Sequence, residues 1–186
     1  MIAVIDYNVG NVSSVLNMCR RLGVTAELMR QSDKIRRASG IILPGVGSFH
    51  VAMRNLTEFG LIDILNDCKA KGTKILGICL GMQILFEKGF EGVETAGLGY
   101  LKGNVDLIKT TAKLPHMGWN NISVGDVYFV HSYMADFTDD CIEFAEYGNV
   151  KIPAIVQKDN VMGCQFHPEK SGKVGEEILR KWMANL

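Results

Sequence analysis

Apolar residues in the first half of the chain alternate between two spacings. Short runs of consecutive apolar residues are typical of buried strands, and they occur at residues 2–6, 26–29, 41–43 and 75–78. Apolar residues at helical spacing lie between or after these runs, at residues 12–22, 61–71 and 80–87. Strands that alternate with helices predict an α/β fold with a mostly parallel sheet, helices on both faces and ligands at the carboxyl ends of the strands.

The second half has a different pattern. Shorter strand-like segments, separated by turn residues, occupy residues 103–108, 127–130 and 142–147. We expect antiparallel hairpins that extend the same sheet, followed by a closing helix over residues 173–186. The chain contains no internal repeat and no low-complexity linker, so residues 1–186 are predicted to form one domain.

Composition excludes several classes of protein. Hydrophobic residues make up 47% of the chain, and 20 basic residues balance 20 acidic residues, so neither a nucleic-acid surface nor a disordered tail is indicated. No apolar run reaches the length of a membrane span, and Met1 leads directly into the first predicted strand without a signal peptide, so we expect a cytoplasmic protein. Five cysteines without a Cys-x-x-Cys pair argue against a disulfide framework and a zinc site.

Cys79 stands where a predicted strand meets a predicted helix. Gly77 and Gly81 bracket it as Gly-x-Cys-x-Gly, the spacing of a nucleophile elbow on a tight strand-to-helix turn. Such a turn would surround the sulfur with backbone N–H groups that stabilise a thiolate, and would leave the Leu80 N–H available to an oxyanion. The alternative is a tight core turn with a buried, inert cysteine. A nucleophilic role requires a base elsewhere in the chain.

The best candidate for that base is His167. It follows the strand predicted at residues 161–166, at the same end of the sheet as Cys79, and Pro168 keeps it extended. Residues two apart in an extended segment face the same way, so Glu169 is expected to orient the His167 ring. Cysteine, histidine and carboxylate together would form a nucleophilic triad.

The other three histidines are assigned lesser roles. His50 is expected in a solvated loop or at a helix start, because nothing acidic accompanies it. His116 and His131 are expected in aromatic-rich loops, with structural hydrogen-bonding roles.

Two motifs resemble the class I, triad-type glutamine amidotransferases: Gly77-Ile-Cys-Leu-Gly-Met-Gln83 and Gln165-Phe-His-Pro-Glu-Lys-Ser171. Three more motifs extend the likeness over nearly the whole chain and narrow it to glutaminase subunits that work with a (β/α)₈ barrel cyclase. These are Pro44-Gly-Val-Gly47, Pro115-His-Met-Gly-Trp-Asn120 and Tyr128-Phe-Val-His-Ser-Tyr133. The resemblance implies glutamine as substrate, and no cofactor or metal.

The resemblance also assigns roles to residues. Cys79 would attack the side-chain amide carbon of glutamine, His167 would exchange protons with Cys79 and the leaving ammonia, and Glu169 would orient His167. The oxyanion would bind the N–H of Leu80 and, after a rearrangement of the Pro44–Gly47 segment, that of Val46. The remaining substrate-binding positions would be Gly47, Gln83, His131, Ser132 and Tyr133. The face that meets the cyclase would include Asn11, Met117, Trp119, Tyr128 and Lys170.

Two positions depart from the family pattern and three alternatives stay open. Asn8 stands where a glycine is usual and Ser13 where an arginine is common, both near the expected partner face.

A free-standing cysteine hydrolase would share the elbow but hardly needs the exposed-looking loop at residues 115–120. A paralogous subunit that supplies ammonia to a sugar-modifying enzyme would keep every motif. A non-catalytic binding subunit is disfavoured because the three triad residues are all present.

Overall fold

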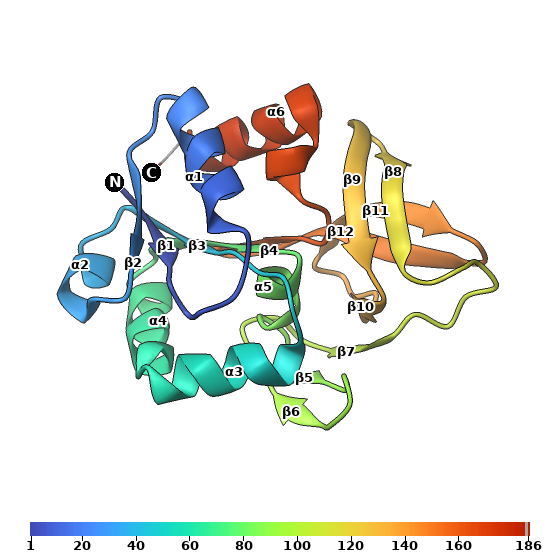
Figure 1. The fold of residues 1–186 in the computed structure, drawn as a ribbon, viewed down its shortest axis with the longest axis horizontal. Helices are drawn as coiled ribbons and strands as arrows, with labels where there is room; N and C mark the ends of the chain where they lie inside the picture. Colours follow the sequence, from blue (N-terminus) through green and yellow to red (C-terminus); the bar gives the residue numbers. More distant parts are fainter. Residues whose placement is uncertain (185) are drawn as a thin grey trace.

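A seven-stranded sheet forms the centre of the molecule in the computed structural model, which describes residues 1–184 and 186 (Figure 1). Its strand order is β11-β12-β13-β4-β3-β1-β2, with β2, β1, β3, β4 and β13 parallel and the β12 and β11 strands antiparallel. The strands span β1 Ile2–Ile5, β2 Ala26–Met29, β3 Gly40–Leu43, β4 Lys74–Ile78, β11 Cys141–Tyr147, β12 Val150–Lys158 and β13 Val161–Cys164. The mostly parallel α/β sheet is confirmed.

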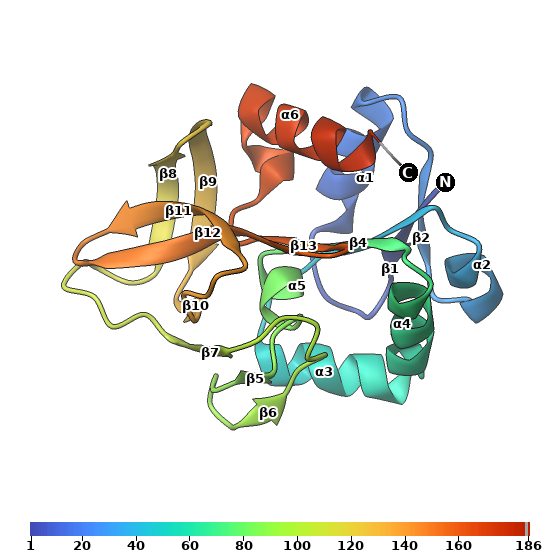
Figure 2. The ribbon, with the colours of Figure 1, turned by 180° about the vertical axis from the view of Figure 1, so that it is seen from behind.

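Helices cover both faces of this sheet (Figures 1 and 2). One face carries α1 (Val12–Arg21) and α6 (Gly172–Met183), and the other carries α3 (Phe49–Glu58), α4 (Leu61–Ala70) and α5 (Leu80–Gln83), with the short α2 (Ser32–Arg36) beside β2. Alternate residues of each strand enter opposite cores. In β1, Ala3 and Ile5 pack with the α3 and α4 side, whereas Ile2 and Val4 pack with α1 and α6.

Two helix predictions need correction, and two helices, α2 and α3, were not predicted. The helix expected over residues 80–87 ends at Gln83, because the carbonyls of Ile84, Leu85 and Phe86 accept hydrogen bonds from the N–H groups of residues 98–101 instead of continuing the helix. The closing helix ends at Met183, and residue 185 of that prediction lies outside the described residues.

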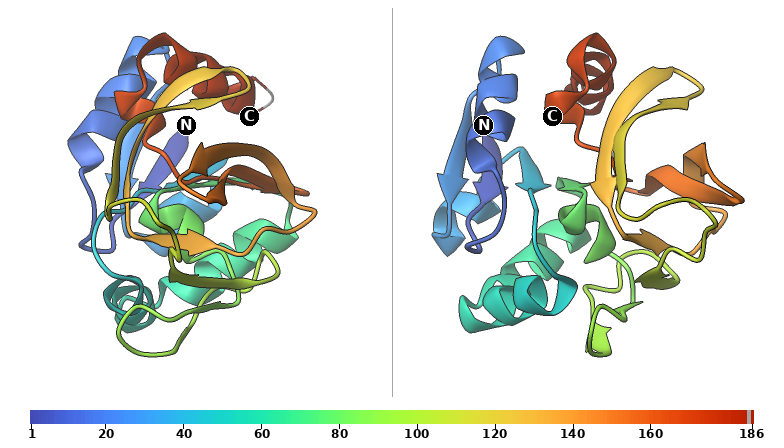
Figure 3. Two further views of the ribbon diagram at one scale, coloured as in Figure 1. Left: turned by 90° about the vertical axis from the view of Figure 1, so that its right-hand side faces the viewer. Right: turned by 45° about the vertical axis from the view of Figure 1, so that its right-hand side comes forward.

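Only part of the second half extends the central sheet, as expected for β11 and β12. The expectation is wrong for the second-half strands that precede β11, which belong to two separate sheets beside the central sheet (Figure 3). One is the hairpin of β8 (His116–Ile122) and β9 (Gly125–His131); the other joins β10 (Tyr133–Ala135), β7 (Asn104–Leu107), β5 (Lys88–Gly89) and β6 (Thr95–Ala96). His116 and His131 therefore lie on paired strands, not in loops.

Among the helices of the described residues, none is both long and apolar enough to cross a bilayer.

Candidate active site

Cys79 occupies a strained turn between β4 and α5. Its φ of 53° lies in the left-handed region, which is costly for a residue with a side chain. A Cβ atom on Gly77 would lie 2.3 Å from the Gly81 carbonyl oxygen, and one on Gly81 would lie 1.9 Å from the Leu43 oxygen. The two glycines are therefore required by contact with backbone, and the predicted elbow geometry is confirmed.

The sulfur of Cys79 is nearly buried but meets polar atoms. The Val130 carbonyl oxygen and the Gln165 amide nitrogen each lie 3.8 Å from Sγ. The N–H of Leu80, at the first position of α5, has no acceptor within the described part of the chain. A donor in this position can bind an oxyanion that forms beside the sulfur.

His167 and Glu169 form a buried pair. His167 Nδ1 lies 2.8 Å from Glu169 Oε1, and the two side chains are only 2% and 3% exposed. The pairing was predicted, but its stated reason was wrong: Pro168–Lys170 is a 3₁₀ turn, and this turn, not an extended segment, brings Glu169 back over the ring. The N–H of His167 also donates to the Tyr128 carbonyl, which ties this turn to β9.

The environment of His167 favours its charged form. Burial lowers its pKa, but the neighbouring Cys79 and the hydrogen bond to Glu169 outweigh burial and raise the pKa to about 9. The other ring nitrogen, Nε2, is buried without a well-formed hydrogen bond to any described residue, the Cys79 sulfur included. That nitrogen is therefore available to carry a proton to and from a reacting group.

A cavity of about 340 Å³ opens at Cys79, at the carboxyl ends of β4 and β3. All seven residues predicted to bind the oxyanion or the substrate line it: Val46, Gly47, Leu80, Gln83, His131, Ser132 and Tyr133. His167 and Glu169 are not among the lining residues, so they would act on Cys79 from behind the cavity wall.

Sequence analysis did not identify three residues that line the cavity: Glu91, Pro115 and Val130. Glu91 matters most chemically, because it brings a negative charge to the cavity. It follows β5, and one of its oxygens accepts the N–H of Phe49 at 2.7 Å. No local motif marks Glu91, so only the folded chain reveals its position.

The Gln83 side chain holds the cavity wall together. Its Nε2 atom donates to the Tyr133 carbonyl at 2.9 Å and to the Gln165 side-chain oxygen at 3.1 Å. Gln83 is therefore buried with its donors satisfied.

The residues expected to meet a partner are surface residues. Met117 and Trp119 point outward from β8 and are 64% and 60% exposed. The Trp119 and Tyr128 rings meet edge to face at 5.9 Å, and Lys170 Nζ lies 5.9 Å from the Tyr128 ring. Asn11 is exposed at the start of α1.

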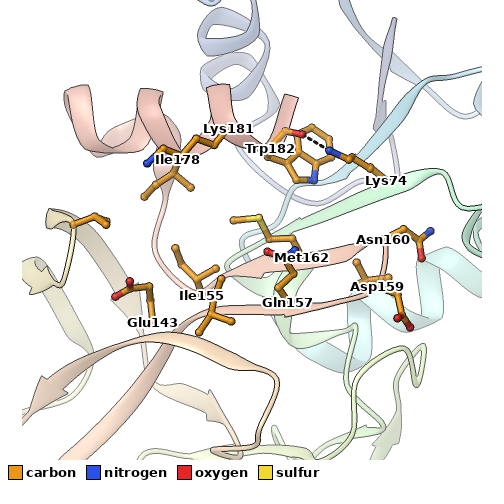
Figure 4. Close-up of a pocket in the computed structure, with 13 residues that line it drawn as sticks. Lys74, Glu143, Ile155, Gln157, Asp159, Asn160, Met162, Ile178, Lys181 and Trp182 are labelled. Atoms are coloured by element: carbon orange, nitrogen blue, oxygen red, sulfur yellow. Dashed lines mark hydrogen bonds between the residues drawn. The ribbon is translucent and has the colours of Figure 1, made fainter. Parts of the chain in front are cut away.

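A second cavity, of about 390 Å³, lies between α6 and the strands of the central sheet, near the starts of β4 and β13 (Figure 4). It is lined by Lys74 at the start of β4, by Val161 at the start of β13 and by Trp182 of α6. The Lys74 ammonium already donates to the Trp182 carbonyl at 3.1 Å. Although it is the larger of the two cavities, none of its described lining residues is a cysteine or histidine, whereas Cys79 and His131 both line the other cavity. The described residues also contain no cluster of three side chains suited to a metal ion.

Comparison with known proteins agrees with this geometry. Residues 3–186 match the family described as "Glutamine amidotransferase class-I". The chain is 50% identical to imidazole glycerol phosphate synthase subunit HisH of Lactococcus lactis, covering 100% of this chain and 98% of that protein. It is 47% identical to the HisH subunit of Streptococcus mutans, covering 98% of each.

Solved structures share the fold at lower identity. A crystal structure of a glutamine amidotransferase superposes with a TM-score of 0.79 at 19% identity, covering 99% of this chain and 98% of that one. The PurLQS structure from Thermotoga maritima gives a TM-score of 0.74 at 20% identity, covering 98% and 97%. The matched family and the extent of the two HisH alignments lead to one conclusion: the chain belongs to the class I glutamine amidotransferase family, among the HisH subunits of imidazole glycerol phosphate synthase.

Proposed function

We propose that this chain hydrolyses glutamine to glutamate and ammonia at Cys79 and passes the ammonia to a cyclase subunit, as the glutaminase half of imidazole glycerol phosphate synthase in histidine biosynthesis. The observation that carries the proposal is the strained Cys79 elbow, with the buried His167–Glu169 pair behind it and a cavity in front. The proposal includes a cytoplasmic location for the complex.

Hydrolysis would proceed in two halves. His167 first takes the thiol proton, the resulting Cys79 thiolate attacks the side-chain amide carbon of glutamine, and the imidazolium then gives that proton to the leaving nitrogen, which departs as ammonia. Water next attacks the thioester carbon, His167 takes a proton from the water, and the carbon–sulfur bond breaks to release glutamate. Glu169 stabilises the imidazolium that forms in each half.

Two backbone N–H groups would stabilise the oxyanion. That of Leu80 points from the start of α5 without another acceptor within the described chain. That of Val46 would join it after the Pro44–Gly47 segment rearranges. Gly47, with a φ of 123°, leaves this segment a backbone freedom that a larger residue lacks.

Glu91 would recognise the α-ammonium group of glutamine. Of the described residues that line the cavity, Glu91 alone is a carboxylate, so it supplies the charge that a zwitterionic amino acid requires at its amino end. Gln83, His131, Ser132 and Tyr133 would shape the wall against the rest of the substrate.

A partner is required because ammonia released into neutral water is protonated and ceases to be a nucleophile. The acceptor site, on a (β/α)₈ cyclase of the HisF type, must therefore connect to Cys79 through a closed passage. The exposed face of Asn11, Met117, Trp119, Tyr128 and Lys170 is the surface proposed to seal against that cyclase, because two of its aromatic side chains and a lysine form one contiguous group.

The test is reconstitution. Tagged chain is used to capture its partner from native extract, the captured protein is identified, and the purified pair is assayed for glutamine-dependent synthesis of imidazole glycerol phosphate. Capture of the cyclase and synthesis that requires Cys79 support the proposal. Capture of a sugar-modifying amidotransferase would identify the paralogous role, and rapid glutamine turnover by the chain alone would indicate a free-standing hydrolase.

A further inference from the structure

Two buried histidine rings contact each other across the β8–β9 hairpin. His116 and His131 are direct cross-strand partners, and His116 Nδ1 lies 3.0 Å from His131 Nε2. The exposed fractions of the two residues are only 3% and 7%. The triad chemistry uses neither ring, so their contact needs its own explanation.

The atoms at the two ends of this contact determine where the protons are. His131 Nδ1 lies 2.8 Å from the Tyr133 carbonyl oxygen, which can only accept, so Nδ1 must carry hydrogen. Burial lowers the pKa of His131 to about 3 and that of His116 to about 4, so both rings are neutral at pH 7. A neutral ring has one N–H, hence His131 Nε2 must accept a hydrogen bond from the Nδ1–H of His116.

The same reasoning assigns the hydrogen bond between His116 and Asn120, which lies closer to the surface. With its hydrogen on Nδ1, His116 has a lone pair on Nε2, and that atom lies 3.2 Å from the Asn120 amide nitrogen. Asn120 Nδ2 also donates to the Glu146 carbonyl at 2.9 Å, so its two hydrogens are both used. The chain from Asn120 through His116 and His131 to Tyr133 is therefore complete in one direction only, with each histidine in the Nδ1–H form.

Stacking fixes the His116 ring independently of its protons. The ring lies between Phe129, with centroids 4.5 Å apart, and Tyr147, with centroids 4.0 Å apart, nearly parallel to each. An aromatic ring without nitrogen would keep this stacking and lose the hydrogen bonds. The two contributions can thus be separated by substitution.

The other end of the chain reaches the glutamine cavity. The Tyr133 carbonyl that accepts from His131 also accepts from Gln83, and all three residues line the cavity. We propose that His116 is a positioning residue for glutamine binding, which acts through His131 to hold the Tyr133 carbonyl and the Gln83 amide in the cavity wall. His116 itself is not a lining residue, and the inference rests on the proposed function.

The central experiment compares two substitutions of His116 in the complex with the cyclase. His116→Phe keeps the stacked ring but removes the donor to His131, and we expect the KM for glutamine to rise about tenfold, the effect of one lost buried hydrogen bond, with kcat changed less than threefold. His116→Asn restores an N–H close to the former Nδ1 position and is expected to recover most of the affinity.

A matched control separates this role from hairpin stability. Ile122→Val trims a buried side chain at the other end of β8, away from the histidine pair, and should lower the melting temperature without changing KM. If His116→Phe leaves KM unchanged, or if His116→Asn and Ile122→Val raise KM as much as His116→Phe does, the positioning role is overturned.

The tautomers of the two histidines can be determined by a measurement that does not depend on enzyme turnover. Long-range proton–nitrogen NMR spectra of the histidine rings in the intact chain should place hydrogen on Nδ1 and a lone pair on Nε2 for both His116 and His131. An Nε2–H form of either ring, together with normal glutamine turnover, would overturn the role of His116 alone. Correct tautomers with no turnover by the wild-type complex would overturn the proposed function and the role of His116 that rests on it.

Discussion

The Nδ1 atom of His167 lies 2.8 Å from the Oε1 atom of Glu169, and both side chains are almost completely withdrawn from solvent. This contact turns the ring so that Nε2 is the nitrogen free to exchange protons. It also places a carboxylate beside the imidazolium that each half of the reaction would create.

Glu169→Gln should slow glutamine hydrolysis less than His167→Ala does. The amide keeps the size of the orienting group but loses its charge, whereas His167 is the residue proposed to transfer the protons. We expect a loss of about 10²- to 10⁴-fold in kcat for His167→Ala and a clearly smaller loss for Glu169→Gln, measured as glutamate release by the loaded complex. Negligible effects of both substitutions would remove the triad assignment and make His131 the next residue to test.

Stability should fall as pH rises through the pKa of His167. Because this pKa is raised from 6.5 to about 9, the folded chain holds the proton more tightly than the unfolded chain does. The stabilisation is fully present below about pH 6.5 and is lost by about pH 9, and it amounts to at most roughly 3 kcal/mol. Urea unfolding of wild type and His167→Gln at several pH values across this range gives the free energy of unfolding of each protein. The difference between the two free energies should shrink as pH rises, and a difference that does not change with pH would contradict the raised pKa.

Replacement of Cys79 by Ala or Ser should abolish glutamine-dependent synthesis and spare synthesis from added ammonium. The reason is that the role proposed for the thiolate is confined to glutamine hydrolysis, so the cyclase is expected to accept ammonia supplied from solution. Both reactions are followed in the same assembled complex, at a pH where enough free ammonia is present. Loss of the ammonium-driven reaction in a folded, assembled variant would count against the role assigned to Cys79.

Glu91→Gln should weaken glutamine binding. The amide oxygen can still accept the Phe49 N–H, so the loop is retained, but the charge that would pair with the substrate ammonium is gone. A charge-assisted hydrogen bond is worth about 1.5–3 kcal/mol, which corresponds to roughly a 10- to 100-fold rise in the KM for glutamine.

Glu94→Gln is the matched control, since Glu94 lies on the same loop, is exposed and pairs with Lys88 on the surface. Equal KM values for the two variants would exclude Glu91 from ammonium recognition.

The isolated chain should be a poor glutaminase that becomes competent with the cyclase bound and loaded. A peptide flip in the Pro44–Gly47 segment would exchange a carbonyl for an N–H at the oxyanion, and loss of one such donor costs about 10²- to 10³-fold in turnover. The measurement is steady-state glutamate release by the chain alone, with cyclase, and with cyclase plus an acceptor analogue. Cys79→Ala corrects for contaminating glutaminase. Equal rates in all three states would show that no gating occurs.

Local pattern in the sequence was sufficient for the central strands and for the elbow. A buried parallel strand such as β4 appears as a continuous apolar run, and Gly-x-Cys-x-Gly appears as a turn, because both depend on residues close together in the chain. The short α2 helix, with one buried apolar residue, carries too little periodicity to be predicted.

Contacts between residues far apart in the chain determined the features that the sequence did not predict. The β7, β8, β9 and β10 strands form separate sheets. The helix after Cys79 stops at Gln83 because the N–H groups of residues 98–101 bind the carbonyls of Ile84, Leu85 and Phe86, and His116 meets His131 through strand register. Glu91 reaches the cavity from a loop without a motif. The sequence by itself determined the parallel core and was enough to propose Cys79 as nucleophile and His167 as its base. Only the tertiary structure assembled the cavity wall, because hydrogen bonds between residues far apart in the chain leave no periodic pattern in either segment.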